Sequence, residues 1–235
     1  MIHISKNSTE LAEELAQHIV SLIVQKLKHR PVFSIALSGG NTPKSLYKLL
    51  AGEPYFSQID WKKIILFWGD ERFVPFDSKE NNAGMAYDEW LSHVPVPAEN
   101  VHRIDTISSP AESAEEYEIM LRSYFKEPQT LDLTLLGMGD DGHTLSIFPA
   151  EKYDDTKWVN ALYSSSKNQW RITLTPAFVN RSAEIIFMIS GKGKAEVLKY
   201  IVDGNGNKTF PAQLIKPVNG NLNWYIDTEA AALLK

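Results

Sequence analysis

Two carboxylates and one imidazole stand within four consecutive residues in the segment Gly137-Met138-Gly139-Asp140-Asp141-Gly142-His143. An imidazole takes up and releases a proton near neutral pH, and a nearby carboxylate can orient it and stabilise its charged form. The other histidines occur in a terminus, in a helix or in ordinary loops, where packing and surface roles are common. We therefore predict that His143 is a general base, that the two acids serve its imidazole, and that Asp141 is the catalytic one.

Three other interpretations of this segment are less favoured. It formally matches G-x-G-x-x-G, but it lies far from the first strand, Pro149 follows too soon for a long helix, and its acids would repel a pyrophosphate. Carboxylates and imidazole also bind metals, but no second histidine lies at ligand spacing. Neither Ser38 nor Ser146 has the G-x-S-x-G context of a serine nucleophile. The segment thus favours activation of water, with no metal and no cofactor.

A glycine-rich turn earlier in the chain has the residue types of a phosphate site. Its glycines let the backbone approach a ligand closely, and its proline suits the first turn of a following helix. Helix amides and hydroxyl or amide side chains together stabilise a phosphate. A plain strand-to-helix turn explains the same pattern equally well when it is taken alone. We predict phosphate binding by Ser38, Gly39, Gly40, Asn41 and Thr42.

Cationic residues follow two further apolar segments. We predict that Arg72, in Asp70-Glu71-Arg72, is catalytic, since it can pair with a phosphate or a developing oxyanion, although such triplets are commonly solvated loops. Lys194, in Gly191-Lys192-Gly193-Lys194, can meet a phosphate dianion, although two solvated lysines are equally consistent with this pattern. We predict a substrate site that also includes Asp70, Gly139 and Arg171, and the sequence leaves open which cation binds the phosphate and which the carbonyl.

Strands and helices alternate along the chain. Apolar runs of strand length occupy residues 32–37, 64–68, 131–136, 171–175, 183–190 and 224–226. Helical periodicity begins at Ser8 or Thr9, which can cap the first helix, and helices are also expected from residue 43 and over 84–91, 113–125 and 192–202. This order predicts an α/β fold with a mostly parallel twisted sheet and helices on both faces, a modified Rossmann-like arrangement. Ligands then bind beyond the carboxyl ends of the strands, where the polar turns lie.

Composition limits the other possibilities. The 235 residues fit one domain spanning residues 1–235, and the absence of cysteine excludes disulfides and thiolate chemistry. With 24 Lys and Arg against 29 Asp and Glu, the charge balance works against nucleic-acid binding. No signal peptide and no apolar run of roughly 20 residues is apparent, so we expect a cytoplasmic protein that does not bind membranes. A monomer or small homo-oligomer is expected.

The polar turns together resemble the 6-phosphogluconolactonase family in order and spacing over nearly the whole chain. The matching residues are those of the turns at 38–43, 69–75, 137–149 and 191–194 and of the strand at 171–175, including a D-G-H-T-x-S-x-F-P string. The resemblance implies hydrolysis of 6-phospho-D-glucono-1,5-lactone in the pentose phosphate pathway, without a cofactor. It also implies the fold shared with glucosamine-6-phosphate deaminases and ribose-5-phosphate isomerases.

Two positions separate this chain from the deaminases, which share the same turns. Their aspartate-glycine-histidine string normally continues to asparagine-glutamate-proline, where this chain has Ile147-Phe148-Pro149, and they tend to carry tyrosine where this chain has Arg72. Asn41, Asn81 and Ala83 depart from the usual lactonase pattern. A deaminase or isomerase and a non-catalytic sugar-phosphate sensor are the alternatives, although the chain shows no DNA-reading module before its first strand.

Overall fold

A six-stranded parallel sheet forms the centre of the molecule. The computed structural model describes residues 1–126, 130–204 and 210–234, and in this part of the chain the strand order is β1-β9-β8-β5-β2-β3. The strands are β1 (Ile2–Ser5), β2 (Phe33–Leu37), β3 (Ile64–Trp68), β5 (Leu133–Leu136), β8 (Glu184–Ile189) and β9 (Asn221–Asp227). All neighbours run parallel, which confirms the predicted fold class.

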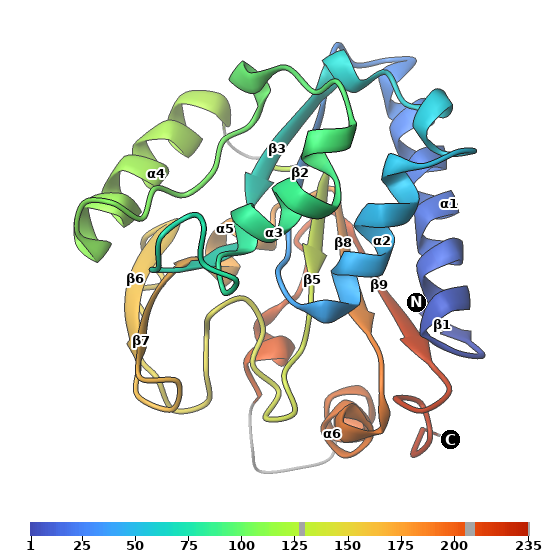
Figure 1. Cartoon of the computed structure of the whole chain (residues 1–235). Helices are drawn as coiled ribbons and strands as arrows, with labels where there is room; N and C mark the ends of the chain where they lie inside the picture. Colours follow the sequence, from blue (N-terminus) through green and yellow to red (C-terminus); the bar gives the residue numbers. More distant parts are fainter. Residues whose placement is uncertain (127–129, 205–209, 235) are drawn as a thin grey trace.

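Helices lie on both sides of this sheet (Figure 1). On one side are α1 (Ser8–Leu27) and α2 (Asn41–Ala51), and α4 (Pro110–Tyr124) lies on the other. The remaining α-helices of the described residues are α3 (Asn82–Glu89), α5 (Pro176–Val179) and α6 (Ala195–Asp203). The predicted cap of the first helix was wrong by one residue, because the Asn7 side chain accepts hydrogen bonds from the backbone N–H groups of Thr9 and Glu10.

A small antiparallel sheet stands beside the central one. Its order is β4-β7-β6, with β4 (Asp70–Arg72), β6 (Val159–Ser164) and β7 (Gln169–Leu174). The sequence predicted a polar turn from Gly69, but Asp70–Arg72 form a strand, and the placement of residues 171–175 in the alternating parallel scheme was also wrong. Strands β1 and β6 were not predicted, because both are short and partly polar. Antiparallel pairing lets this sheet keep one face polar.

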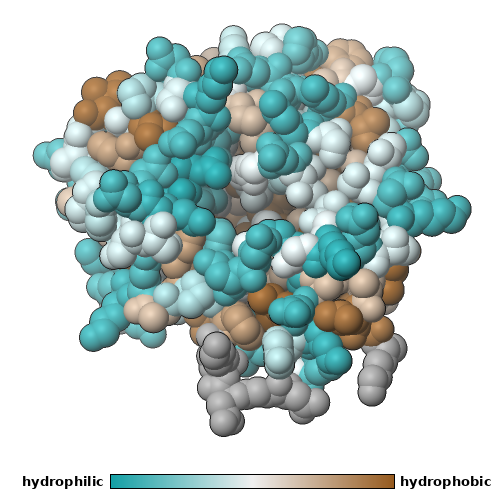
Figure 2. Space-filling view, turned by 60° about the horizontal axis from the view of Figure 1, so that its bottom comes forward, coloured by the Kyte–Doolittle hydropathy of each residue, from teal (hydrophilic) through white to brown (hydrophobic). Residues whose placement is uncertain are grey.

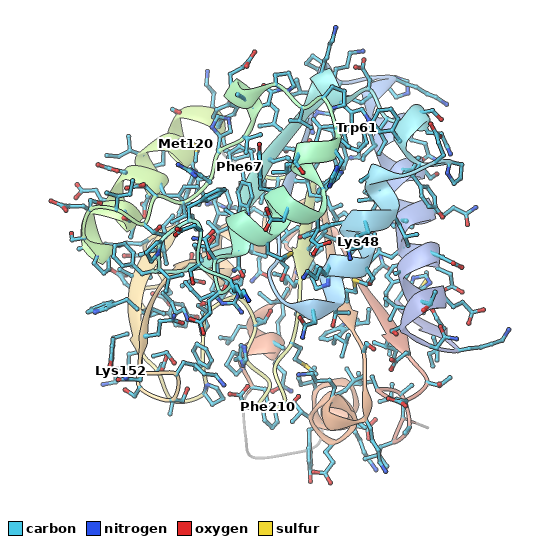
Figure 3. All side chains as sticks on the ribbon, in the orientation of Figure 1. Lys48, Trp61, Phe67, Met120, Lys152 and Phe210 are labelled. Atoms are coloured by element: carbon cyan, nitrogen blue, oxygen red, sulfur yellow. The ribbon has the colours of Figure 1, made fainter. Side chains whose placement is uncertain are left out.

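The core fills the space between the central sheet and its helices. The stripe of α1 that includes Leu11, Leu15 and Ile19 is fully buried, as are all residues of β2 and β3. Phe67 of β3 packs against aromatic residues near the end of α4 (Figure 3). No helix among the described residues combines the length and the apolar character needed to cross a bilayer.

The carboxyl ends of the parallel strands meet at one edge of the sheet, at the bottom of Figure 1. Turning that edge forward shows a hollowed centre with a largely hydrophilic rim (Figure 2). The turns after β2, β3, β5 and β8 lie at this edge because those four strands are neighbours in the sheet. The topology therefore gathers the polar turns that lie far apart in the sequence.

Candidate active site

One pocket of about 310 Å³ holds nearly all of the predicted site residues. Every candidate residue except Asp141 lines it, namely Ser38, Gly39, Gly40, Asn41, Thr42, Asp70, Arg72, Gly139, His143, Arg171 and Lys194. Asn82, Met138 and Ser190 also line the pocket and were not predicted. Asp141 stands behind His143, in contact with its ring. The walls thus combine one imidazole, one carboxylate and three cations.

His143 and Asp141 form a hydrogen-bonded pair. Asp141 Oδ1 lies 2.5 Å from His143 Nδ1 and 3.1 Å from the His143 backbone nitrogen, so the aspartate contacts both ring and backbone. Since Nδ1 is engaged, Nε2 is the nitrogen available to a ligand in the pocket. Burial raises the pKa of Asp141, but the hydrogen bonds and charge of His143 outweigh it and hold that pKa below its ordinary value. Asp141 is therefore an ionised partner for the imidazole.

The loop that carries this pair is shaped by close packing. A Cβ atom at Gly139 would lie 2.0 Å from His143 Nδ1, so only glycine leaves room for the ring. Phe148, which is buried, packs against the imidazole with 4.4 Å between ring centroids. Phe210, low in Figure 3, packs against Gly142, where a Cβ atom would fall 2.5 Å from its ring. The imidazole is thereby held between an aromatic ring and a carboxylate.

Asp140 does not serve the imidazole, which corrects the prediction that both acids do so. Its carboxylate forms an ion pair with Lys194 Nζ. The Asp140 side chain is 73% exposed, whereas that of Lys194 is 24% exposed and lines the pocket. The two consecutive aspartates therefore contact different partners: Asp141 contacts the proposed base, and Asp140 contacts a cation that lines the pocket.

The glycine-rich turn has the geometry of an anion site. Gly40 adopts a φ of 100° as the N-cap of α2, a conformation that side-chain-bearing residues rarely adopt. The buried Tyr47 braces the turn, since its hydroxyl donates to the Ser38 carbonyl oxygen at 2.7 Å and accepts from the Ser38 N–H at 3.1 Å. The backbone amides at the start of α2, which have no partner within the helix, then form part of the pocket wall.

Two arginines lie directly opposite each other across the small sheet. Arg72 of β4 pairs in register with Arg171 of β7, and both side chains line the pocket. Arg171 is buried, its Nε lacks a hydrogen-bond partner within the described residues, and burial lowers its pKa. Adjacent like charges on opposite strands repel each other. An anion bound between them would relieve that repulsion.

Asp70 and Glu71 point to opposite faces of β4 and have different surroundings. The Asp70 carboxylate lines the pocket and accepts a 2.6 Å hydrogen bond from the buried Ser146 hydroxyl. Glu71 is fully buried behind the pocket, where its carboxylate accepts from the backbone N–H groups of Arg72, Asn82 and Ala83. Glu71 thus fastens the start of α3 to β4.

Glu71 is expected to make stability depend on pH. Burial raises its pKa from 4.5 to about 7, although the three backbone hydrogen bonds oppose that rise. A raised folded-state pKa stabilises the fold fully below about pH 4.5, and this stabilisation is lost as the pH rises through 7. Glu71→Gln is the reference, because it lacks the titrating carboxyl group. Relative to this variant, the free energy of unfolding of the wild type should fall by up to about 3 kcal/mol as the pH rises from 4.5 to 8. Urea denaturation of both proteins at each pH measures this difference in the free energy of unfolding. A difference that grows in favour of the wild type as the pH rises contradicts the account.

Comparison with known proteins places these features in a family context. Residues 6–224 match the family model of glucosamine-6-phosphate isomerases and 6-phosphogluconolactonases. A 6-phosphogluconolactonase of Haemophilus influenzae is 38% identical over 93% of this chain and 97% of its own length, and one of a Nostoc species is 35% identical over 99% and 98%. The solved 6-phosphogluconolactonase of Trypanosoma brucei has a TM-score of 0.89 at 29% identity, covering 100% of this chain and 98% of that one.

Proposed function

The chain belongs to the family of glucosamine-6-phosphate isomerases and 6-phosphogluconolactonases, and we propose that it hydrolyses 6-phospho-D-glucono-1,5-lactone to 6-phospho-D-gluconate with His143 as general base. This is lactone hydrolysis in the oxidative branch of the pentose phosphate pathway. The observation that carries the choice is the pairing of His143 with a single carboxylate, Asp141, while Phe148 packs on the ring. The deaminase pattern places a glutamate at the Phe148 position.

The substrate's phosphate binds at the turn of residues 38–42, with Lys194 opposite its charge. Amides at the start of α2 donate hydrogen bonds to phosphate oxygens, and Lys194 contributes a positive charge. Arg72 and Arg171 lie on the adjacent wall, where a second negative group, the carbonyl oxygen or a phosphate oxygen, meets them. Fixing the phosphate positions the lactone carbonyl near His143.

Hydrolysis then proceeds by proton transfer through the imidazole. His143 Nε2 takes a proton from water as the water oxygen attacks C1, and Asp141 stabilises the resulting imidazolium. Negative charge develops on the carbonyl oxygen, where Arg72 or turn amides stabilise it. As the bond between C1 and the ring oxygen breaks, the imidazolium returns its proton to the ring oxygen. The product is the open-chain acid, and the base is regenerated.

The two alternatives make different demands on the site. Among the described residues, Asp141 is the carboxylate that contacts His143, so the second carboxylate of the deaminase string has no counterpart there. A non-catalytic sensor would bind the sugar phosphate without turnover. Mixing the purified chain with fresh 6-phosphogluconolactone and following acid release decides between enzyme and sensor. Release above the spontaneous rate is expected, and binding without acceleration would overturn the proposal.

Asp140 is expected to weaken phosphate binding, because its carboxylate forms an ion pair with Lys194 and competes with a phosphate for that cation. Exposed ion pairs contribute little, so Asp140→Asn should lower the KM for the lactone by about 2- to 5-fold. Salt screens exposed charges, and the difference should shrink in about 1 M salt. Steady-state kinetics at low and high salt measure both effects. An unchanged or higher KM in Asp140→Asn would show that the ion pair does not compete with phosphate.

We further propose that residues 1–235 act as one lactonase domain in the cytoplasm, as a monomer or small homo-oligomer. The substrate is a small sugar-phosphate lactone, and neither nucleic acid nor membrane is a partner. The net charge of −5 supports the exclusion of nucleic acid, because a protein binds a nucleic-acid backbone by neutralising its phosphates with many Lys and Arg residues. No metal and no cofactor takes part in the proposed steps.

A further inference from the structure

We propose that Asn82 is a positioning residue for Arg72, holding its guanidinium in the pocket wall against the glycine-rich turn. The inference rests on the proposed lactonase function, in which Arg72 meets a negative group of the substrate. Asn82 is the first residue of α3 and follows the loop after β4, ten positions beyond Arg72 in the chain. Its side chain is 1% exposed, so its contacts are with protein groups rather than with solvent.

Both ends of the Asn82 carboxamide are engaged. Its Nδ2 donates a 2.9 Å hydrogen bond to the carbonyl oxygen of Asp70, and its Oδ1 accepts from a guanidinium nitrogen of Arg72. Its backbone N–H donates to the buried carboxylate of Glu71 at 2.7 Å. A flipped amide would turn its NH₂ group toward the guanidinium, which also only donates. The orientation of Asn82 is therefore determined by its neighbours.

The same carboxamide lies directly against the glycine-rich turn. A Cβ atom at Gly39 would fall 1.7 Å from Asn82 Oδ1, so the side chain fills the space that glycine leaves. Asn82, at the start of α3, thus touches two other segments that build the pocket, namely the glycine-rich turn and β4. A change at this residue alters the distance between the phosphate turn and the arginine.

Arg72 needs such a restraint because its neighbour repels it. Arg171 lies opposite it in the small sheet, and a long side chain with a like charge beside it favours swinging toward solvent. Among the described residues, Arg72 is restrained through its side chain by Asn82 and by the Glu80 carbonyl oxygen at 3.0 Å. Of these two partners, only Asn82 is buried, and its backbone is held by a hydrogen bond to the Glu71 carboxylate.

Asn81 offers a matched control. It is also an asparagine, is 2% exposed, and caps the same helix by accepting from the Gly84 N–H at 2.8 Å while donating to the Val74 carbonyl oxygen at 3.2 Å. These contacts secure the loop and do not involve the Arg72 side chain. Asn81→Ala should therefore lower the melting temperature while kcat/KM stays within about 2-fold.

A double-mutant cycle tests the inference. Asn82→Ala should lower kcat/KM for the lactone by about 5- to 30-fold, as expected for releasing one long charged side chain. In an Arg72→Ala background the same substitution should change kcat/KM by less than about 2-fold, because the residue it positions is gone. Equal losses in the two backgrounds would overturn the inference and assign Asn82 a direct or purely structural role.

Two further measurements keep failure of the inference separate from failure of the fold or of the function. Asn82→Ser replaces Asn82→Ala if the alanine variant does not fold, since serine retains a polar helix start without reaching Arg72. If the wild type does not accelerate lactone hydrolysis, the proposed function fails, and the cycle is read from the Kd for 6-phosphogluconate by calorimetry. Non-additive changes in that Kd support the inference, and additive changes overturn it.

Discussion

Replacing His143 with alanine should lower kcat for 6-phosphogluconolactone by about 100- to 10,000-fold, the range that general-base catalysis contributes. The pocket loses the nitrogen that accepts the proton of the attacking water, whereas the phosphate turn and the cations remain. Because the proposed mechanism uses His143 only in the transition state, KM should change little. Initial rates corrected for spontaneous hydrolysis measure kcat, and calorimetry with 6-phosphogluconate measures whether binding is retained.

His93→Ala is the control for this experiment. His93 is an exposed histidine whose ring contacts the Asp88 carbonyl oxygen, and it does not line the pocket. Its replacement should leave kcat within about 2-fold of the wild type, since surface substitutions rarely disturb a site. If His143→Ala keeps a near-normal kcat, His143 is not the base and the proposed mechanism is wrong.

Replacing Lys194 with methionine should raise the KM for the lactone by about 10- to 150-fold. A hydrogen bond to a charged group contributes roughly 1.5–3 kcal/mol, and loss of that energy from substrate binding gives this factor. Methionine keeps an unbranched side chain of similar length and removes the charge. The effect should be confined to phosphorylated ligands, so the Kd for inorganic phosphate should rise while turnover of bound substrate changes less.

Lys192→Met is the matched control for Lys194→Met. Lys192 belongs to the same 3₁₀ turn, Lys192–Lys194, but it does not line the pocket. Its removal changes the net charge equally and should leave KM within about 2-fold at physiological salt, where exposed charges are screened. Similar increases of KM in both variants would show that long-range charge, not contact with Lys194, attracts the substrate.

Much of the fold could be predicted because the parallel strands are buried on both faces. The run 64–68 is entirely apolar, the run 33–37 is apolar except for Ser34, and each is followed by a polar turn, so both strand and site edge can be read from composition. The candidate residues were found because their turns follow neighbouring strands. The resemblance to the lactonases, confirmed by the family match, joined turns whose spatial proximity no local pattern reveals.

The errors came from long-range pairing that local patterns do not record. Asp70–Arg72 resembles a charged loop, and it becomes a strand only because β7, a hundred residues later, offers a partner. Asp140 and Asp141 are adjacent in sequence and of equal charge, so composition could not show that one faces Lys194 and the other His143. Asn82 was missed because a buried carboxamide is recognisable only from its contacts. Its place in an asparagine pair at the start of a helix was the one local signal.

The most direct test gives the purified chain two substrates under identical conditions. Formation of 6-phosphogluconate from fresh 6-phosphogluconolactone is followed beside release of ammonia from glucosamine-6-phosphate, each corrected for its uncatalysed rate. We expect acceleration of lactone hydrolysis that is lost in His143→Ala, and no release of ammonia. Acceleration of ammonia release without acceleration of lactone hydrolysis would contradict the assignment.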